Sequence, residues 1–212
     1  MQTSPTRAPR RDAAENRTAL LDAARLILNQ DPDASLETIA TAAGLSRRAV
    51  YGHFATRDDL VRALLDRGAS GVVASLESVG HPDPTVRVAL IASRLWHEVE
   101  NIRVMALFAV RGPLKLHTAA HLAPVRLRVR EAVEQGQADG TFRTDIPSDR
   151  LARLIEDSAL SVLEESARSA LAQREGHRLV MLTTLGTIGL GWREAAAVID
   201  THEELAWKDI TR

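Results

Sequence analysis

Apolar residues recur at helical spacing along almost the whole of this 212-residue chain. No segment of five or more residues alternates cleanly between apolar and polar side chains, as a half-buried strand would. Aromatic residues, which strands favour, make up only 3% of the sequence. We therefore expect an all-α protein whose helices are separated at the eight prolines.

The segments between the prolines predict the individual elements. Residues 1–11 are expected to form a flexible basic arm that contains three arginines and no acid. Helices are expected over 12–30, 36–43, 47–53, 57–79, 84–110, 124–138, 148–173 and 176–192, and about 196–207, with a broken stretch over 114–122. The longest uncharged run, 179–192, is too short to span a bilayer and is typical of a buried helix.

The composition excludes several classes of protein. The 27 basic and 28 acidic residues exclude a wholly basic protein such as a histone, although a local basic patch is allowed. The absence of cysteine excludes disulfides, thiolate metal sites and cysteine nucleophiles. Because the N-terminus lacks the apolar stretch of a secretory signal, we expect a cytoplasmic protein with no membrane partner.

Residues 35–54 have the pattern of two short helices joined by a tight turn. Ser35 is placed to cap the first helix, and Gly44 follows its end, where glycine permits a left-handed conformation. Ser46 is placed to cap the second helix, over 47–53. This pattern predicts a helix-turn-helix, whose second helix enters the major groove of DNA.

The exposed side of that second helix carries candidate DNA contacts. Arg47 and Arg48 stand at its start, the part of a recognition helix that reads base edges. Tyr51, His53 and Arg57 are able to donate hydrogen bonds to phosphates.

With these elements the sequence resembles the TetR family of bacterial transcriptional regulators. The resemblance is carried by residues 20–24, 39–40, 43–46, 50–54 and 57–60. It implies a helix-turn-helix DNA-binding domain over 12–58 and a larger helical ligand-binding and dimerisation domain over 59–212.

The resemblance also implies roles for single residues. The base-facing positions are Arg47, Arg48 and Ala49, and the phosphate-contacting positions are Tyr51, His53 and Arg57. Arg57 stands where the family usually has lysine, which keeps the charge. Gly52 stands where several members have a larger residue, so a DNA contact from this position is expected to be lost. Glu37 is expected either to restrict where phosphates lie or simply to cap its own helix.

The last two long helices are implied to form a four-helix bundle with a second copy of the chain. The run 179–192 is apolar on all sides, which predicts burial on all sides. The candidate interface residues are Leu151, Ile155, Leu182, Leu185, Gly186 and Gly189, where the glycines would let another helix come close. The alternative is that these helices build only the core of one protomer.

Family members usually enclose a ligand pocket in the region of 84–110 and 114–138. Helix-bundle interiors host such mostly apolar sites with a few polar groups. The candidate lining residues are Trp96, His97, Arg103, Met105, Phe108, His117 and His121, and core packing is the alternative for each. His117 and His121 have the spacing of metal ligands, but no third ligand and no HExxH motif accompany them, so no metal site is expected.

No nucleotide-binding or nucleophile-elbow motif is present, and neither a catalytic residue nor a cofactor is expected. The sequence therefore predicts a homodimeric repressor that binds a palindromic operator in double-stranded DNA and is released by a small-molecule effector. The alternatives are an activator or a regulator controlled by a protein partner, and, from another class, a helical enzyme or metal-binding protein.

Overall fold

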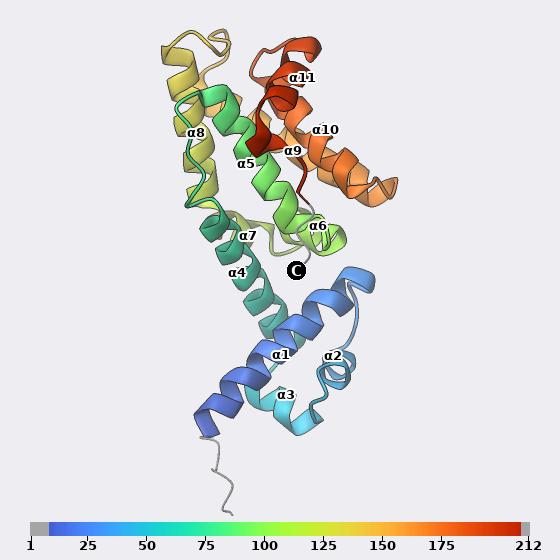
Figure 1. Cartoon of the computed structure of the whole chain (residues 1–212). Helices are drawn as coiled ribbons and strands as arrows, with labels where there is room; N and C mark the ends of the chain where they lie inside the picture. Colours follow the sequence, from blue (N-terminus) through green and yellow to red (C-terminus); the bar gives the residue numbers. More distant parts are fainter. Residues whose placement is uncertain (1–8, 209–212) are drawn as a thin grey trace, which may run out of the picture. The chain divides into compact units, whose positions relative to one another are not determined.

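The computed structural model describes residues 9–208, with side chains from residue 13, and every regular element in that range is helical (Figure 1). The all-α prediction is confirmed. The chain divides into two compact units, Met1–Arg67 (unit 1) and Gly68–Arg212 (unit 2). The division falls inside helix α4, some way beyond the domain boundary expected after residue 58.

Unit 1 contains three helices and the first part of a fourth, namely α1 (Pro9–Gln30), α2 (Leu36–Ala42), α3 (Arg47–His53) and α4 (Arg57–Ser75). Helix α1 begins at Pro9, so residues 9–11 are helical and do not belong to an arm. Proline suits the first helical position because an N–H there has no partner within the helix. The rest of the expected arm, residues 1–8, lies outside the described residues.

The turn between α2 and α3 has the chemistry that the sequence predicts. Ser35 Oγ accepts the backbone N–H of Thr38, and Ser46 Oγ accepts that of Ala49, so each serine caps one helix. Gly44 has φ +68°, a conformation that residues with a Cβ rarely adopt. These local features fix where α2 ends and where α3 begins.

The core of unit 1 draws apolar side chains from all of its helices. The buried residues are Leu20, Leu21, Ala24, Leu28, Leu36, Ile39, Ala40, Val50, Phe54, Leu60, Val61, Leu64 and Leu65. Because α3 points Val50 into this core, its arginines remain on the surface.

Unit 2 is a helical bundle that contains, after the end of α4, seven α-helices and a 3₁₀ turn among the described residues. They are α5 (Pro84–Val99), α6 (Arg103–Arg111), α7 (Lys115–His121), α8 (Ala123–Ala138), α9 (Ser148–Arg168), α10 (Gln173–Thr187), α11 (Trp192–Thr201) and η1 (Glu203–Leu205). Helices α5 and α9 each pack against both α8 and α10 (Figure 1). No helix within residues 9–208 is both long and apolar enough to cross a bilayer.

The single helix expected over 84–110 is in fact two. Helix α5 ends at Val99, and α6 begins after Ile102, whose φ of −136° leaves the helical range. The Arg103 guanidinium stabilises this break because it donates to the carbonyl oxygens of Glu100, Ser166 and Leu171. Two of these carbonyls are distant in sequence, so helical periodicity could not reveal the break.

The apolar run 179–192 is also interrupted. Helix α10 ends at Thr187, and Gly189 adopts φ +113°, while Leu190 N–H returns to the carbonyl of Leu185. Gly189 therefore terminates a helix and does not stand in the middle of one, as the sequence suggested. The last helix, expected over 196–207, is α11 and begins at Trp192.

Candidate functional site

Helix α3 presents a small polar surface in unit 1. The side chains of Arg47, Arg48 and Tyr51 are exposed, whereas Ala49 and His53 are half-buried. Ser46 caps the N-terminus of the helix, and Val50 on its inner face is buried. This arrangement leaves two guanidinium groups at the start of a rigid helix, where base-reading side chains are found in helix-turn-helix proteins.

Glu37 of α2 contacts two side chains of this surface. Its Oε1 accepts a hydrogen bond from Tyr51 Oη at 2.9 Å and lies 3.3 Å from Arg47 Nη2. The Arg47 guanidinium also lies over the Tyr51 ring, 5.5 Å from its centroid. The Tyr51 hydrogen bond and then the backbone contacts lower the pKa of the Glu37 carboxyl, so the group is an anion at neutral pH.

Arg57 has a structural role in this conformation. Its Nε donates to the Ala34 carbonyl at 2.9 Å, and its Nη2 donates to the Pro32 carbonyl. These bonds fasten the start of α4 to the loop that precedes α2. The N-terminus of α4 is capped as the sequence suggests. Thr56 and Asp59 exchange reciprocal hydrogen bonds there.

A cavity of about 590 Å³ lies within unit 2 and is lined mainly by α5, α7, α8, α9 and α10, with single residues from α4 and α6. This volume is within the range of small-molecule sites. Most of its wall is aliphatic, and its apolar residues include Ile91, Leu95, Trp96, Leu122, Val125, Ala152, Ile155, Ala159 and Val180.

Polar side chains stand at a few points of the cavity wall. Arg126 pairs with Glu156 at 3.2 Å, and Arg153 pairs with Asp149 at 3.0 Å. Thr118, on α7, is only 4% exposed, and its Oγ1 has no hydrogen-bond partner in the described part of the chain. The site can therefore enclose an apolar molecule and offers it a hydroxyl group.

Of the predicted ligand residues, Trp96 lines this cavity, and the others do not. Arg103 is engaged with backbone carbonyls, and Met105 is buried apart from the cavity. Phe108 is half-buried on α6 and also lies outside the lining. The break between α5 and α6 interrupts the helical face on which these residues were expected to continue.

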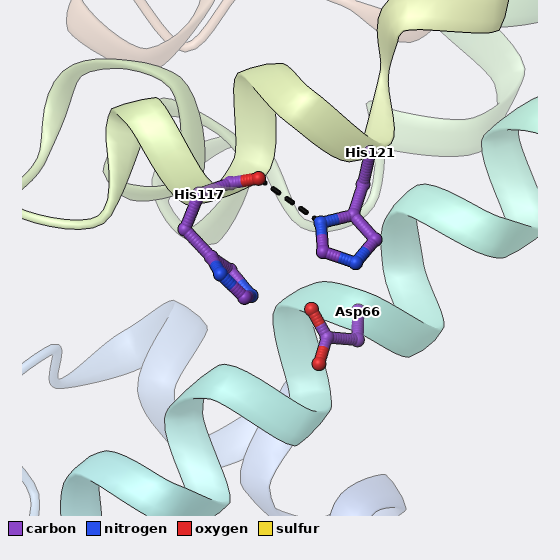
Figure 2. Close-up of side chains that lie close together, drawn as sticks. All are labelled: Asp66, His117 and His121. Carbon is purple, nitrogen blue, oxygen red and sulfur yellow. Dashed lines mark hydrogen bonds between the residues drawn. The ribbon is translucent and has the colours of Figure 1, made fainter.

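His117 and His121 lie on the part of α7 that does not line the cavity. Figure 2 shows His121 Nδ1 beside the His117 carbonyl oxygen, 3.0 Å away, and the two rings are 4.7 Å apart. The cavity-lining residues of the same helix are Lys115, Thr118 and Ala119. These histidines therefore lie outside the lining of this cavity, because helical geometry places them on another face of α7.

His97 belongs to a buried aromatic cluster that the sequence did not indicate. Its ring lies 4.9 Å from those of His177 and Trp207. His177 is 2% exposed, and its Nε2 lies 2.7 Å from Ser93 Oγ. Burial lowers the pKa of His177 to about 4 and also lowers that of His97. The only signal for His177 is its place on the inward face of α10, one turn before Met181.

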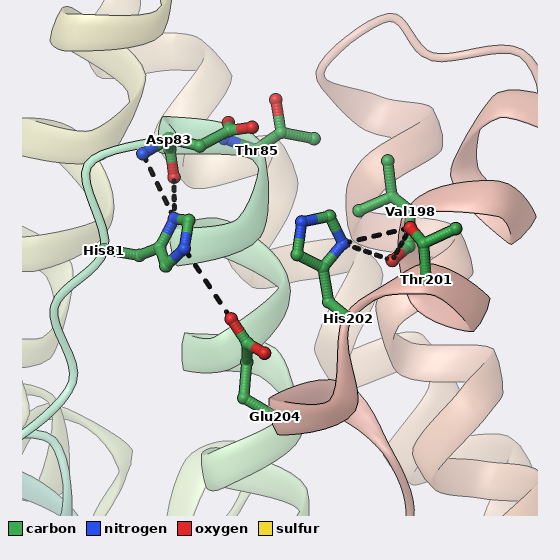
Figure 3. Close-up of polar contacts among 7 residues, drawn as sticks. All are labelled: His81, Asp83, Thr85, Val198, Thr201, His202 and Glu204. Carbon is green, nitrogen blue, oxygen red and sulfur yellow. Dashed lines mark hydrogen bonds and ion pairs between the residues drawn. The ribbon is translucent and has the colours of Figure 1, made fainter.

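A second histidine pair fastens the C-terminal segment of unit 2 (Figure 3). His81 Nδ1 accepts the backbone N–H of Asp83, and its Nε2 lies 3.6 Å from Glu204 Oε1. His202 Nδ1 lies 2.8 Å from the Val198 carbonyl oxygen. These contacts tie η1 to the loop before α5, so the histidines serve packing and lie away from the cavity.

Half of the expected dimer residues are buried within a single chain. Leu151, Ile155 and Leu185 are 0–4% exposed in the core of unit 2, so intramolecular packing already occupies them. Leu182 is half-buried, and Gly186 is exposed with open space around it. Leu154, on α9, is 41% exposed. It is an apolar surface residue that was not among the predicted interface residues.

The chain is similar to bacterial regulators in its N-terminal part. Residues 20–64 match the family model described as "Bacterial regulatory proteins, tetR family". A 48-residue stretch is 50% identical to the HTH-type transcriptional repressor LfrR of Mycolicibacterium smegmatis. That match covers 23% of this chain and 25% of LfrR, so the chain spans about a quarter of this relative's length.

Solved structures show the same fold over most of the chain. SmeT, described as the repressor of the Stenotrophomonas maltophilia multidrug efflux pump SmeDEF, is 22% identical, with a TM-score of 0.67 over 83% of this chain and 90% of SmeT. FadR of Bacillus subtilis, solved with stearoyl-CoA, is 13% identical, with a TM-score of 0.71 over 81% of this chain and 97% of FadR. At sequence identities of 22% and 13%, the structural similarity establishes the fold alone.

Proposed function

Since residues 20–64 match the model of the tetR family, we propose that the chain belongs to this family and is a transcriptional regulator that binds double-stranded DNA through α3. In the finer form of the proposal it is a homodimeric repressor, released from a palindromic operator by a small molecule bound in unit 2. The observation that carries the proposal is the capped, exposed helix α3 with Arg47 and Arg48 at its start.

The DNA contacts divide into two kinds. Arg47 and Arg48 are proposed to read base edges, and Ala49 is small enough to let α3 approach the groove floor. Tyr51 and His53 are proposed to donate to phosphates. Arg57 adds positive charge at the start of α4, although a direct phosphate contact requires it to release the carbonyls of residues 32 and 34.

The proposed dimer uses α9 and α10, through the side of these helices that the chain's own core leaves uncovered. Leu154, Leu182 and Gly186 are the residues on which this interface is proposed to depend. A two-fold axis would present the two α3 helices to half-sites about 34–36 Å apart, so the operator would be palindromic.

The proposed effector occupies the cavity of unit 2, a volume suited to a small molecule. Helix α4 belongs to both units and is the covalent connection through which the effector would act on DNA binding. To lower operator occupancy about a hundredfold, the effector must favour the non-binding conformation by about 2.7 kcal/mol.

Selection of bound sites from randomised duplex DNA, at about 150 mM salt, tests the proposal. A recovered palindrome would support sequence-specific binding by a dimer and would supply the operator for release assays. If the folded, dimeric protein recovers no motif, sequence-specific DNA binding by this chain alone is refuted under those conditions. Effector-dependent release from the recovered operator then distinguishes the proposal from control by a protein partner.

A further inference from the structure

The cavity of unit 2 contains a buried hydroxyl group that the protein itself does not satisfy. Thr118 lines the cavity from α7 and is 96% buried, yet its Oγ1 has no hydrogen-bond partner among the described residues. A buried polar group without a partner is destabilising and rare in folded proteins. Its position in the wall of an apolar cavity points to a partner that arrives from outside the chain.

A second threonine of the same cavity provides the contrast. Thr184, on α10, donates its hydroxyl to the carbonyl oxygens of Val180 and Met181, at 2.9 and 3.0 Å. This return to a carbonyl three or four residues earlier is the ordinary way in which a helical threonine is satisfied. Thr118 does not do so, although the carbonyl of Leu114 lies one turn before it and accepts its backbone N–H.

The charges of the cavity wall indicate which head group is suited to Thr118. The arginines of the wall, Arg126, Arg130 and Arg153, are each paired with a carboxylate. Lys115, one helical turn before Thr118, lines the cavity and has no ion-pair partner in the described part of the chain. An unpaired ammonium group repels a cationic ligand and attracts an anionic one.

We propose that the cavity binds an aliphatic molecule with a single oxygen-bearing head group, neutral or anionic, which accepts a hydrogen bond from the Thr118 hydroxyl. Lys115 disfavours cationic molecules of the same size. The aliphatic wall supplies most of the affinity, and Thr118 determines where the head group lies. The inference deepens the proposed function, because it names the chemical class of the effector.

Three probes with the same alkyl chain test the inference, namely dodecanoate, dodecanol and dodecyltrimethylammonium. Each is titrated calorimetrically into the full-length protein without DNA, the two ionic probes below their micelle concentrations and the alcohol below its solubility limit. Saturable binding of dodecanoate and dodecanol is expected, with affinity for the cation at least about tenfold lower. The Thr118→Val variant should bind the alcohol and the carboxylate about tenfold more weakly.

Thr184→Val is the matched control, because it removes a hydroxyl from the same wall that is already bonded within α10. It should leave the affinity for each probe within about twofold, and thermal melting shows whether both variants are folded. Since Thr118→Val removes an unsatisfied group, its ligand-free form should melt no lower than the wild type.

The inference is overturned if no probe binds saturably, if the cation binds as tightly as the others, or if Thr118→Val and the wild type bind equally. Probes that bind with the expected dependence on Thr118 but do not release operator DNA would support the inference. They would count against only the proposed control of DNA binding by a ligand, so the two failures are distinguishable.

Discussion

The Glu37 carboxylate of α2 accepts a hydrogen bond from the Tyr51 hydroxyl of α3, with 2.9 Å between the two oxygens. The same carboxylate oxygen lies 3.3 Å from the Arg47 guanidinium. Two of the proposed DNA contacts are therefore held by an acidic side chain in the absence of DNA. The arrangement orders these side chains but also opposes their transfer to phosphates or bases.

Replacing Glu37 with glutamine should strengthen DNA binding of every sequence by a few fold, because a negative charge leaves the binding surface. The affinity should be measured by fluorescence anisotropy over a range of salt concentrations. Glu77→Gln, an exposed substitution in unit 2, is the control and should have no effect. Unchanged affinity in Glu37→Gln would show that Glu37 lies away from the bound DNA.

Arg48→Ala should cost about 1–3 kcal/mol of operator binding and relax the preference at one base pair, if this side chain is bidentate to guanine. Arg48 is exposed, so its removal should leave the free energy of unfolding nearly unchanged. Binding to a panel of single-base operator variants measures the effect. An equal loss on all sequences would instead assign Arg48 to a phosphate.

Arg57 is expected to matter for stability as well as for DNA binding. Arg57→Ala removes two hydrogen bonds from a charged donor to backbone carbonyls and should destabilise unit 1 by about 1–3 kcal/mol. Arg57→Lys retains the charge but not the planar arrangement of donors. It should therefore retain most of the DNA affinity while losing much of the free energy of unfolding that the two hydrogen bonds contribute. Urea unfolding and anisotropy separate the two effects; full stability of Arg57→Ala would contradict the structural role.

Buried His177 should make unfolding depend on pH between its ordinary pKa of 6.5 and its lowered pKa of about 4. In that window the unfolded chain binds a proton that the folded chain does not, so stability falls as the pH falls. From pH 7 to pH 5 this single group should remove roughly 2 kcal/mol from the free energy of unfolding in urea.

His177→Asn should be less stable at pH 7, because it loses the contact with Ser93, but its stability should depend less on pH in this window. His81→Asn is the control, since His81 lies in the loop before α5 and should leave the pH dependence largely intact. An unaltered pH dependence in His177→Asn would assign the effect to other groups.

Gly189→Ala should destabilise unit 2 by more than about 1 kcal/mol, because φ +113° is strained for any residue with a side chain. An added Cβ would also lie 3.3 Å from Arg143 Cβ. Gly186→Ala, three residues earlier in open space, should be neutral or slightly stabilising in the monomer. Thermal melting compares the two, and equal effects would mean that the backbone conformation at Gly189 is not a constraint.

The features that depend on neighbouring residues could be predicted from residue types and their spacing. The caps at Ser35 and Ser46 and the turn at Gly44 are local, because each involves residues at most a few positions apart. Such interactions follow from residue type and spacing, so the helix-turn-helix and the all-α fold were predicted correctly. The bounds of α3 agree with the prediction for the same reason.

The contacts between side chains that are distant in the sequence depend on tertiary packing and could not be predicted. Arg57 reaches carbonyls more than twenty positions earlier, and Arg103 reaches α9 and the loop that follows it. The break beside Arg103 separates the predicted pocket residues Arg103, Met105 and Phe108 from the helical face that lines the cavity. The unsatisfied Thr118 hydroxyl follows from the packing of several helices around one space, which no local pattern of the sequence specifies.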